Sequence, residues 1–471
     1  MRVLLISPPD TGILKNNSPA EIEKNTGLFP PLNILTLASY LNNSLRHSAR
    51  VLDLASSGEN RLKRFLKLFN PKAVGITCVS FNLPSAIMTA SLIKKFDPEI
   101  KIIFGGPHPT VFPEETLRLK EVDFVVKGEG EKTLLELIDA LSMKKSFSGI
   151  RGLYYQESGV LHKNPERELI ENLDTLPFPD RGLLAGRKYY NILSLRYPST
   201  TMLSGRGCMR ECTFCLQSLG RTLRLRSCNS VVDEMQTVIG RGIKDIFFVD
   251  DAFSESRERV IRICREIIKR KLRINWAVKG RTDNVDLEML RIMRKAGCRR
   301  IHFGVESANI NTLRRMKKRN SPEKAIRAFR SSRIAGIQTG AELMLGAPGE
   351  TYSDSWNTVE FARELNPDYA FFYITTPYPG TPLYEESLRE GVIRTDYWRQ
   401  FAENPYEGMN IRYWEEFMDA GELDLLLKKA YKSFYFRPDY MLKTLMRTGS
   451  PVMLIRRARL AASLGYYTVI S

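Results

Sequence analysis

Short apolar runs alternate with amphipathic stretches along the first 145 residues. The apolar runs lack the polar alternation of a strand with one wet face, so they are typical of strands covered on both sides. The expected strands are Arg2–Ser7, Arg50–Leu54, Ala73–Ser80, Lys101–Gly106 and Phe124–Lys127. The expected helices between them are Leu32–Leu45, Leu62–Phe69, Ser85–Phe96 and Glu131–Leu141. This order predicts a doubly wound, largely parallel α/β sheet over residues 1–145.

A second series of strand–helix units runs over residues 191–385. It follows a segment, 146–190, whose proline-rich stretch Asp174–Arg181 predicts a linker. The expected strands are Thr200–Leu203, Asp245–Val249, Asn275–Val278, Arg300–Gly304, Ala341–Leu345 and Tyr369–Thr375. The expected helices are Val231–Ile239, Arg257–Lys269, Leu287–Ala296, Pro322–Ala335 and Ser353–Glu364. Repeated strand–helix units predict a barrel or a partial barrel of the TIM type, here expected as (β/α)6, with its active site at the carboxyl ends of the strands. Residues 386–471 read as a basic helical region.

Three segments lie at the carboxyl ends of expected strands of the first sheet, and two of them contain glycines. They are Thr77–Ser80, Gly105-Gly106-Pro107-His108 and Gly128-Glu129-Gly130. Glycine lets a backbone approach a bulky ligand closely. Each loop alone reads as an ordinary turn, but carboxyl ends of parallel strands share one edge of a sheet, where ligands bind. Three loops on that edge favour a cofactor crevice.

Composition and charge narrow the class of protein. The 471 residues are 43% hydrophobic and 10% aromatic, which excludes a mostly disordered chain. Seven cysteines are too few for a disulfide framework and indicate a reducing compartment. No signal peptide or run of about 18 apolar residues is present, so we expect a cytoplasmic protein.

The net charge of +18 is compatible with nucleic acid, an anionic membrane or an acidic substrate. Nucleic acid is disfavoured because the basic residues are dispersed and no nucleic-acid module is recognisable. Between Lys428 and Arg459 nine Lys or Arg residues accompany a single acid, Asp439. This tail is expected to be a helical cap with a solvated charged face, and the alternative is a peripheral membrane contact.

The most specific chemical feature is the spacing Cys208-x-x-x-Cys212-x-x-Cys215. Thiolates are soft ligands that suit zinc or iron–sulfur clusters. A structural zinc site needs four ligands, usually in two closely spaced pairs. The next cysteine, Cys228, is thirteen residues beyond Cys215, so no fourth cysteine lies nearby in the sequence. Three thiolates in a loop fit a cubane cluster that has one open iron. A zinc-binding interaction protein is the alternative from a different class.

The cysteine spacing resembles the signature of the radical S-adenosylmethionine (SAM) superfamily. Further landmarks agree in order: Phe248-Val-Asp-Asp251, Gly304-Val-Glu-Ser307, Gly346-Ala-Pro-Gly-Glu-Thr351 and Pro379-Gly-Thr-Pro382. The resemblance implies that Cys208, Cys212 and Cys215 hold a [4Fe–4S] cluster whose open iron binds SAM. The SAM contacts that it implies are Phe214, Asp250, Asp251, Arg281, Glu306 and Ser307. Each acid is equally readable as a helix cap or a loop contact.

The N-terminal region resembles the cobalamin-binding domain of one radical SAM subfamily, which includes methyltransferases, hopanoid methylases and the anaerobic magnesium-protoporphyrin ester cyclase. The implied cobalamin contacts are Thr77, Ser80, Gly105, Gly106, His108, Gly128, Glu129 and Gly130. The motif Asp-x-His-x-x-Gly of other cobalamin enzymes is absent. A histidine as lower cobalt ligand is therefore not expected, and His108 is not assumed to fill that place.

The resemblance implies reductive cleavage of SAM to a 5′-deoxyadenosyl radical, followed by methylation of an unactivated carbon. The implied substrate is a hydrophobic small molecule such as a natural product, a lipid or an isoprenoid. The implied electron donor is a flavodoxin or a ferredoxin. The alternative within the same class is oxidative cyclisation, dehydrogenation or carbon–carbon coupling without methyl transfer.

Overall fold

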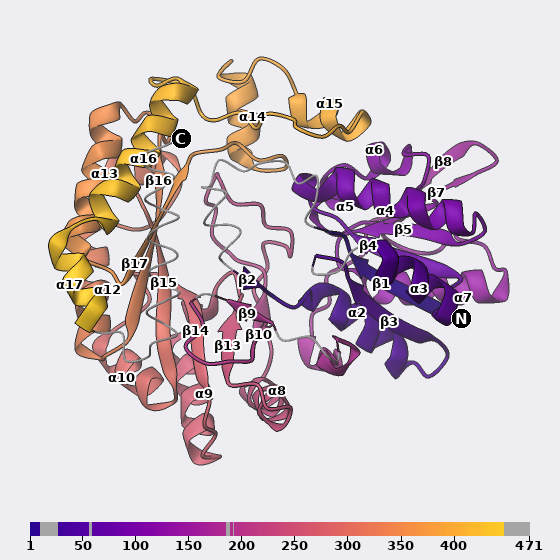
Figure 1. Cartoon of the computed structure of the whole chain (residues 1–471), viewed down its shortest axis with the longest axis horizontal. Helices are drawn as coiled ribbons and strands as arrows, with labels where there is room; N and C mark the ends of the chain where they lie inside the picture. Colours follow the sequence, from indigo (N-terminus) through magenta and orange to yellow (C-terminus); the bar gives the residue numbers. More distant parts are fainter. Residues whose placement is uncertain (10–26, 56–58, 185–188, 192, 447–471) are drawn as a thin grey trace.

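The computed structural model describes residues 1–9, 27–55, 59–184, 189–191 and 193–446. Two α/β units lie side by side, and helices of the C-terminal region cross above both of them (Figure 1). The first unit is the N-terminal sheet and the second is the barrel.

The N-terminal sheet has the strand order β3-β1-β4-β5-β6-β7-β8. Its first five strands run parallel, as predicted. Their bounds are β3 Ser48–Asp53, β1 Arg2–Ser7, β4 Ala73–Thr77, β5 Lys101–Gly105 and β6 Phe124–Val126. The helices are α2 Leu32–Asn43, α3 Glu59–Phe69, α4 Leu83–Phe96 and α7 Gly130–Met143. Leu4 and Ile6 enter one buried cluster while Val3 and Leu5 enter another, which confirms a sheet covered on both faces.

The linker prediction for residues 146–190 is wrong for one part of that segment. Strands β7, Leu153–Glu157, and β8, Val160–Lys163, add an antiparallel hairpin to the sheet beside β6. The turn between them places Ser158 and Gly159 at φ 52° and 79°. Two successive residues of positive φ are typical of the type I′ turn, whose twist suits a hairpin. The first of these positions holds serine, where asparagine or glycine is usual, so the sequence did not predict the turn.

The barrel is the predicted six-stranded parallel sheet, with the order β10-β13-β14-β15-β16-β17. The strands are β10 Ser199–Met202, β13 Asp245–Phe248, β14 Asn275–Gly280, β15 Cys298–Glu306, β16 Gln338–Leu345 and β17 Tyr369–Ile374. The helices are α8 Cys228–Gly240, α9 Arg257–Lys269, α10 Leu287–Lys295, α12 Pro322–Ile334 and α13 Tyr352–Leu365. Among the described residues β10 and β17 do not pair, so the barrel is open on one side.

The C-terminal region contains α14 Pro382–Arg389, α15 Tyr397–Glu403, α16 Ala420–Tyr435 and α17 Pro438–Met446. Trp398 and Phe401 of α15 join the core of the N-terminal sheet, whereas Leu423 and Leu426 of α16 join the core of the barrel. The region therefore ties the two units together (Figure 1).

The basic tail predicted as a cap or a membrane contact lies outside the described residues from 447 onward. Within the described ranges, no helix is both long and apolar enough to cross a membrane.

Candidate active site

The three cysteines lie on one loop at the carboxyl end of β10. A short antiparallel pair, β11 Gly205–Arg206 and β12 Arg224–Leu225, closes the loop at its base. Gly207 leaves this pair at φ 82°, and a Cβ there would lie 2.3 Å from the Thr222 carbonyl oxygen. Only glycine fits this position. The loop is anchored further by the Thr213 N–H, which donates to the Met316 carbonyl at 3.1 Å.

The three thiols are free and none is fully buried. Burial raises the pKa of Cys215 to about 11, and Asp251 and the other two thiols act in the same direction. Iron must therefore displace protons when it binds. Across the described ranges no three His, Cys, Asp or Glu side chains converge to hold a single ion. A cubane places each thiolate on a different iron and needs no such convergence.

Lys318 and Glu306 form a buried ion pair beside the cysteine loop. The Lys318 ammonium lies 2.6 Å from Glu306 Oε1 and 5.9 Å from the centre of the Phe214 ring. Burial alone lowers the pKa of Lys318, but Glu306 and the neighbouring Cys212 raise it above its usual value. The ammonium therefore stays charged next to the thiols. Phe214 and Glu306, both predicted SAM contacts, thus meet at this loop.

The adjacent acids Asp250 and Asp251 have different surroundings. Asp250 is buried and accepts hydrogen bonds from the Ser204 N–H at 2.7 Å and from the Ser204 hydroxyl. The Asp251 residue is exposed overall but its carboxylate is partly desolvated, which raises its pKa more than the Gly207 N–H lowers it. Asp250 therefore fixes the strand-end backbone, and Asp251 is the acid that faces the cysteine loop.

Two further predicted contacts are engaged within the protein. The Ser307 hydroxyl donates to Glu350 Oε1 at 2.6 Å, so two of the sequence landmarks bind each other. Arg281 forms a bidentate pair with Asp283, at 2.9 Å for each bond. Burial lowers the pKa of Arg281, but Asp283 and then Cys212 raise it above its usual value.

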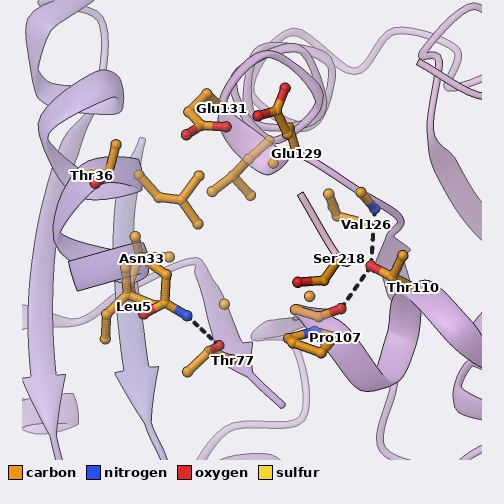
Figure 2. Close-up of a pocket in the computed structure, with 18 of the residues that line it drawn as sticks. Leu5, Asn33, Thr36, Thr77, Pro107, Thr110, Val126, Glu129, Glu131 and Ser218 are labelled. Carbon is orange, nitrogen blue, oxygen red and sulfur yellow. Dashed lines mark hydrogen bonds between the residues drawn. The ribbon is translucent and has the colours of Figure 1, made fainter. Parts of the chain in front are cut away.

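A cavity of about 290 Å³ lies at the carboxyl edge of the N-terminal sheet. Figure 2 shows Asn33, Thr77, Thr110, Glu129 and Glu131 around it. Its strand lining comes from β1, β4, β5 and β6, so it reaches the switch point between β1 and β4, where doubly wound sheets bind ligands. Six of the eight predicted cobalamin contacts line it: Thr77, Gly105, Gly106, Gly128, Glu129 and Gly130.

The other two predicted contacts, Ser80 and His108, do not line the cavity. The Ser80 hydroxyl and His108 Nδ1 share a hydrogen bond of 2.9 Å. Burial lowers the pKa of His108 to about 3, so the imidazole is neutral. The structure therefore places His108 outside the lining of the cavity.

The far wall of the cavity comes from the barrel. Leu203, Arg206, Ser218 and Leu219 face it, and Ser218 follows Cys215 by only three residues. The edge of the N-terminal sheet and the cysteine loop therefore share one wall.

Two family models match the chain in these two places. The radical SAM superfamily matches residues 202–362, and the B12 binding domain matches residues 22–138. An uncharacterized methyltransferase of Pyrococcus horikoshii is 34% identical over 94% of each chain. The chain belongs to the radical SAM superfamily, in the group with a B12 binding domain.

Other relatives agree with this assignment. The anaerobic magnesium-protoporphyrin IX monomethyl ester cyclase of Rubrivivax gelatinosus is 28% identical over 94% of this chain and 78% of its own. The radical SAM methyltransferase TsrM of Kitasatospora setae, solved with cobalamin and a [4Fe–4S] cluster, has a TM-score of 0.73 at 19% identity over 98% of each chain. The cobalamin-dependent radical SAM enzyme OxsB has a TM-score of 0.75 at 19% identity, over 99% of this chain and 71% of its own.

This radical SAM enzyme uses a [4Fe–4S] cluster, SAM and cobalamin, and its residues fit all three. Three thiols on one loop, with no fourth described cysteine on that loop, suit a cluster with an open iron. The cavity edge suits a bulky ring because Gly128, at φ 77°, leaves open space where a side chain would stand.

Sequence reasoning missed several residues of the radical SAM site. Lys318 lies more than a hundred residues after Cys212 and carries no motif. Glu131 and Arg206 form a buried pair of 2.5 Å across the two units, and Arg206 also holds Glu129 at 2.8 Å. Acidic and basic residues that are far apart in the sequence are very common, so the sequence alone does not show which of them form ion pairs.

Proposed function

We propose that this enzyme transfers a methyl group to an unactivated carbon of a small-molecule substrate. The observation that supports this most is the shared wall, because it sets the cavity of the B12 domain directly against the cysteine loop. A methyl donor and a radical generator that act on one substrate must face the same space.

The side chains of the site would divide the work as follows. Cys208, Cys212 and Cys215 would hold the cluster, while Asp251 and Glu306 would offer carboxylates to the polar groups of SAM. When bound, the cluster and SAM supply a carbon radical, and cobalamin supplies the methyl group. The Lys318 ammonium balances the Glu306 carboxylate and stabilises the anionic thiolates.

The proposed electron donor is a flavodoxin or a ferredoxin that approaches the cysteine loop. Met209 is 59% exposed there, and the Arg319 side chain is 73% exposed. Arg319 pairs with the exposed Glu211 at 3.5 Å, so the loop offers an apolar side chain beside charges of both signs, which suits a transient contact with a donor protein.

Product analysis tests the proposed function. The protein is reconstituted without oxygen with iron, sulfide and cobalamin, and then given SAM and a low-potential reductant. We expect both 5′-deoxyadenosine and S-adenosylhomocysteine. The cyclase relative makes oxidative cyclisation the second candidate. 5′-Deoxyadenosine without S-adenosylhomocysteine would contradict methyl transfer and support that candidate.

A further inference from the structure

A second cavity, of about 180 Å³, lies inside the barrel and is separate from that in Figure 2. Its lining comes from every second residue of strands β13 to β17. The intervening residues, such as Val278 and Leu343, pack outward into the barrel core. The inward residues that matter here are Phe247, Lys279, His302, Glu342, Phe371 and Tyr373.

One wall of this cavity is a row of flat rings. The ring centres of Phe29 and Phe247 are 5.9 Å apart. The His302 ring centre lies 5.7 Å from that of Phe247 and 5.7 Å from that of Phe371, on which His302 stacks. Gly340 makes room for this row, since a Cβ there would come within 2.7 Å of His302 Nδ1. Ring pairs at these separations attract, and the same surface suits a further aromatic ring.

The opposite part of the cavity is polar. Glu342 Oε1 lies 3.9 Å from both the Lys279 ammonium and His302 Nδ1, which is too long for a hydrogen bond. Burial lowers the pKa of His302 well below its usual value, so the ring is neutral. Among the described residues, the Lys279 ammonium, the Glu342 carboxylate and the Tyr373 hydroxyl make no hydrogen bond. Convergent polar groups beside an apolar wall are what fix the orientation of a ligand.

The cavity lies directly beneath the strand-end site. Lys279 is on β14, whereas Arg281 follows the end of that strand. Glu342 pairs with Gly304, whereas Glu306 comes after a register irregularity nearer the carboxyl end of β15. A molecule in this cavity therefore lies further from the carboxyl ends of the strands than the proposed SAM contacts.

We infer that this cavity binds the substrate, and that the substrate is an aromatic molecule whose polar end carries an ammonium and a carboxylate group. Its ring lies on the row formed by Phe247, His302 and Phe371. Glu342 holds the ammonium, and Lys279 with Tyr373 holds the carboxylate. An aromatic molecule with both charged groups is a narrower class of substrate than the hydrophobic small molecule or natural product that the family resemblance implies. The assignment of this molecule as the substrate rests on the proposed function, whereas its binding in the cavity does not.

Equilibrium dialysis of labelled L-phenylalanine against the cluster-loaded protein tests the inference. We expect saturable binding that both phenethylamine and 3-phenylpropionate displace. Glu342→Gln lowers the affinity for phenylalanine about tenfold or more, because a charge-assisted hydrogen bond is lost. It weakens displacement by phenethylamine but not by 3-phenylpropionate, and Lys279→Met does the reverse. The matched controls Glu364→Gln and Lys295→Met, exposed on outer helices, leave binding unchanged.

Several outcomes would overturn the inference. These are no binding of phenylalanine, equal affinity in the variants and wild type, or displacement of phenylalanine by SAM, which would assign the groups to SAM. If a charge variant fails to fold, Tyr373→Phe removes only a hydroxyl and is expected to weaken binding about threefold. SAM cleavage is measured on the same sample. Cleavage without phenylalanine binding refutes this inference alone, whereas absent cleavage refutes the proposed function.

Discussion

Neighbouring residues at the barrel end have separate tasks that their contacts define. Asp250 accepts two hydrogen bonds from Ser204 inside the protein, while Asp251 turns toward the cysteine loop. The Ser307 hydroxyl likewise donates a hydrogen bond to Glu350, and the Glu306 carboxylate accepts one from Lys318. Glu306 adopts φ 67°, where a non-glycine residue is strained. Such strain persists where the surroundings fix the residue, as the ion pair with Lys318 does here.

Removal of any loop cysteine is expected to abolish the cluster. Cys208→Ala, Cys212→Ala and Cys215→Ala should each lose iron and sulfide after anaerobic reconstitution, together with the broad visible absorption. Cys228→Ala is the matched control, because Cys228 lies at the start of α8 away from the loop. A control variant that loses as much iron as the loop variants would contradict the assignment.

Asp250 should make stability depend on pH. Burial raises its pKa from 3.8 to about 6, while the hydrogen bonds from Ser204 oppose this. The folded protein keeps the proton to higher pH than the unfolded chain, so the stabilising contribution is full below pH 3.8 and is lost as the pH rises through about 6. The melting temperature of Asp250→Asn minus that of wild type should therefore increase from about pH 4.5 to 7.

Asp354 provides the opposite sign. Hydrogen bonds from Thr351 lower its pKa, so its contribution is present above 3.8 and is lost as the pH falls. Asp354→Asn should lose stability relative to wild type as the pH rises. A difference for Asp250→Asn that stays constant with pH would refute the account of its burial.

At the scale of elements, buried ion pairs connect the carboxyl edge of the N-terminal sheet to the loop that follows the first barrel strand. Arg206 of β11 holds Glu129 and Glu131, at the start of α7, and Arg224 of β12 also holds Glu129 at 2.8 Å. All four side chains are at most 10% exposed. Two cations and two anions give a neutral cluster that adjoins the cavity of Figure 2.

Breaking this charge cluster should be costly. Arg206→Met leaves the Glu131 carboxylate buried without its cation and should lower the free energy of unfolding by about 3–5 kcal/mol. The double variant Arg206→Met with Glu131→Gln should recover part of that loss. Denaturant unfolding of the two variants and wild type measures both effects. The exposed pair Arg363–Glu360 is the control, since Arg363→Met should cost less than about 1 kcal/mol. Equal losses in the two arginine variants would contradict the role of burial.

The strands and helices were predictable because their patterns are local. Buried runs such as β1 and β4, and the cysteine spacing, can be read within a few residues. The β7–β8 hairpin escaped because Ser158 carries the positive φ that glycine or asparagine usually signals. Lys318 and Arg206 escaped because their roles depend on partners far away in the chain. The roles of Asp250 and Ser307 depend on side-chain direction, which the landmarks do not specify.

At the scale of the molecule, the chain builds two cofactor units and then returns to join them. The Trp398 indole N–H donates to the Pro377 carbonyl at 3.2 Å, and Arg399 pairs with Glu115 of the N-terminal unit. Further along, Tyr431 and Tyr435 bond to the backbone of β17. The C-terminal region therefore holds the B12 domain at a fixed place relative to the barrel, as a shared substrate space requires.

Tracking the methyl group of SAM tests the central claim most directly. The fully reconstituted protein is given SAM whose methyl carries deuterium, under a low-potential reductant and without oxygen. The account predicts that mass spectrometry finds the label on the protein-bound corrinoid, with an equal amount of S-adenosylhomocysteine, and that 5′-deoxyadenosine forms in the same sample. An unlabelled corrinoid, with 5′-deoxyadenosine as the sole SAM-derived nucleoside, would contradict it.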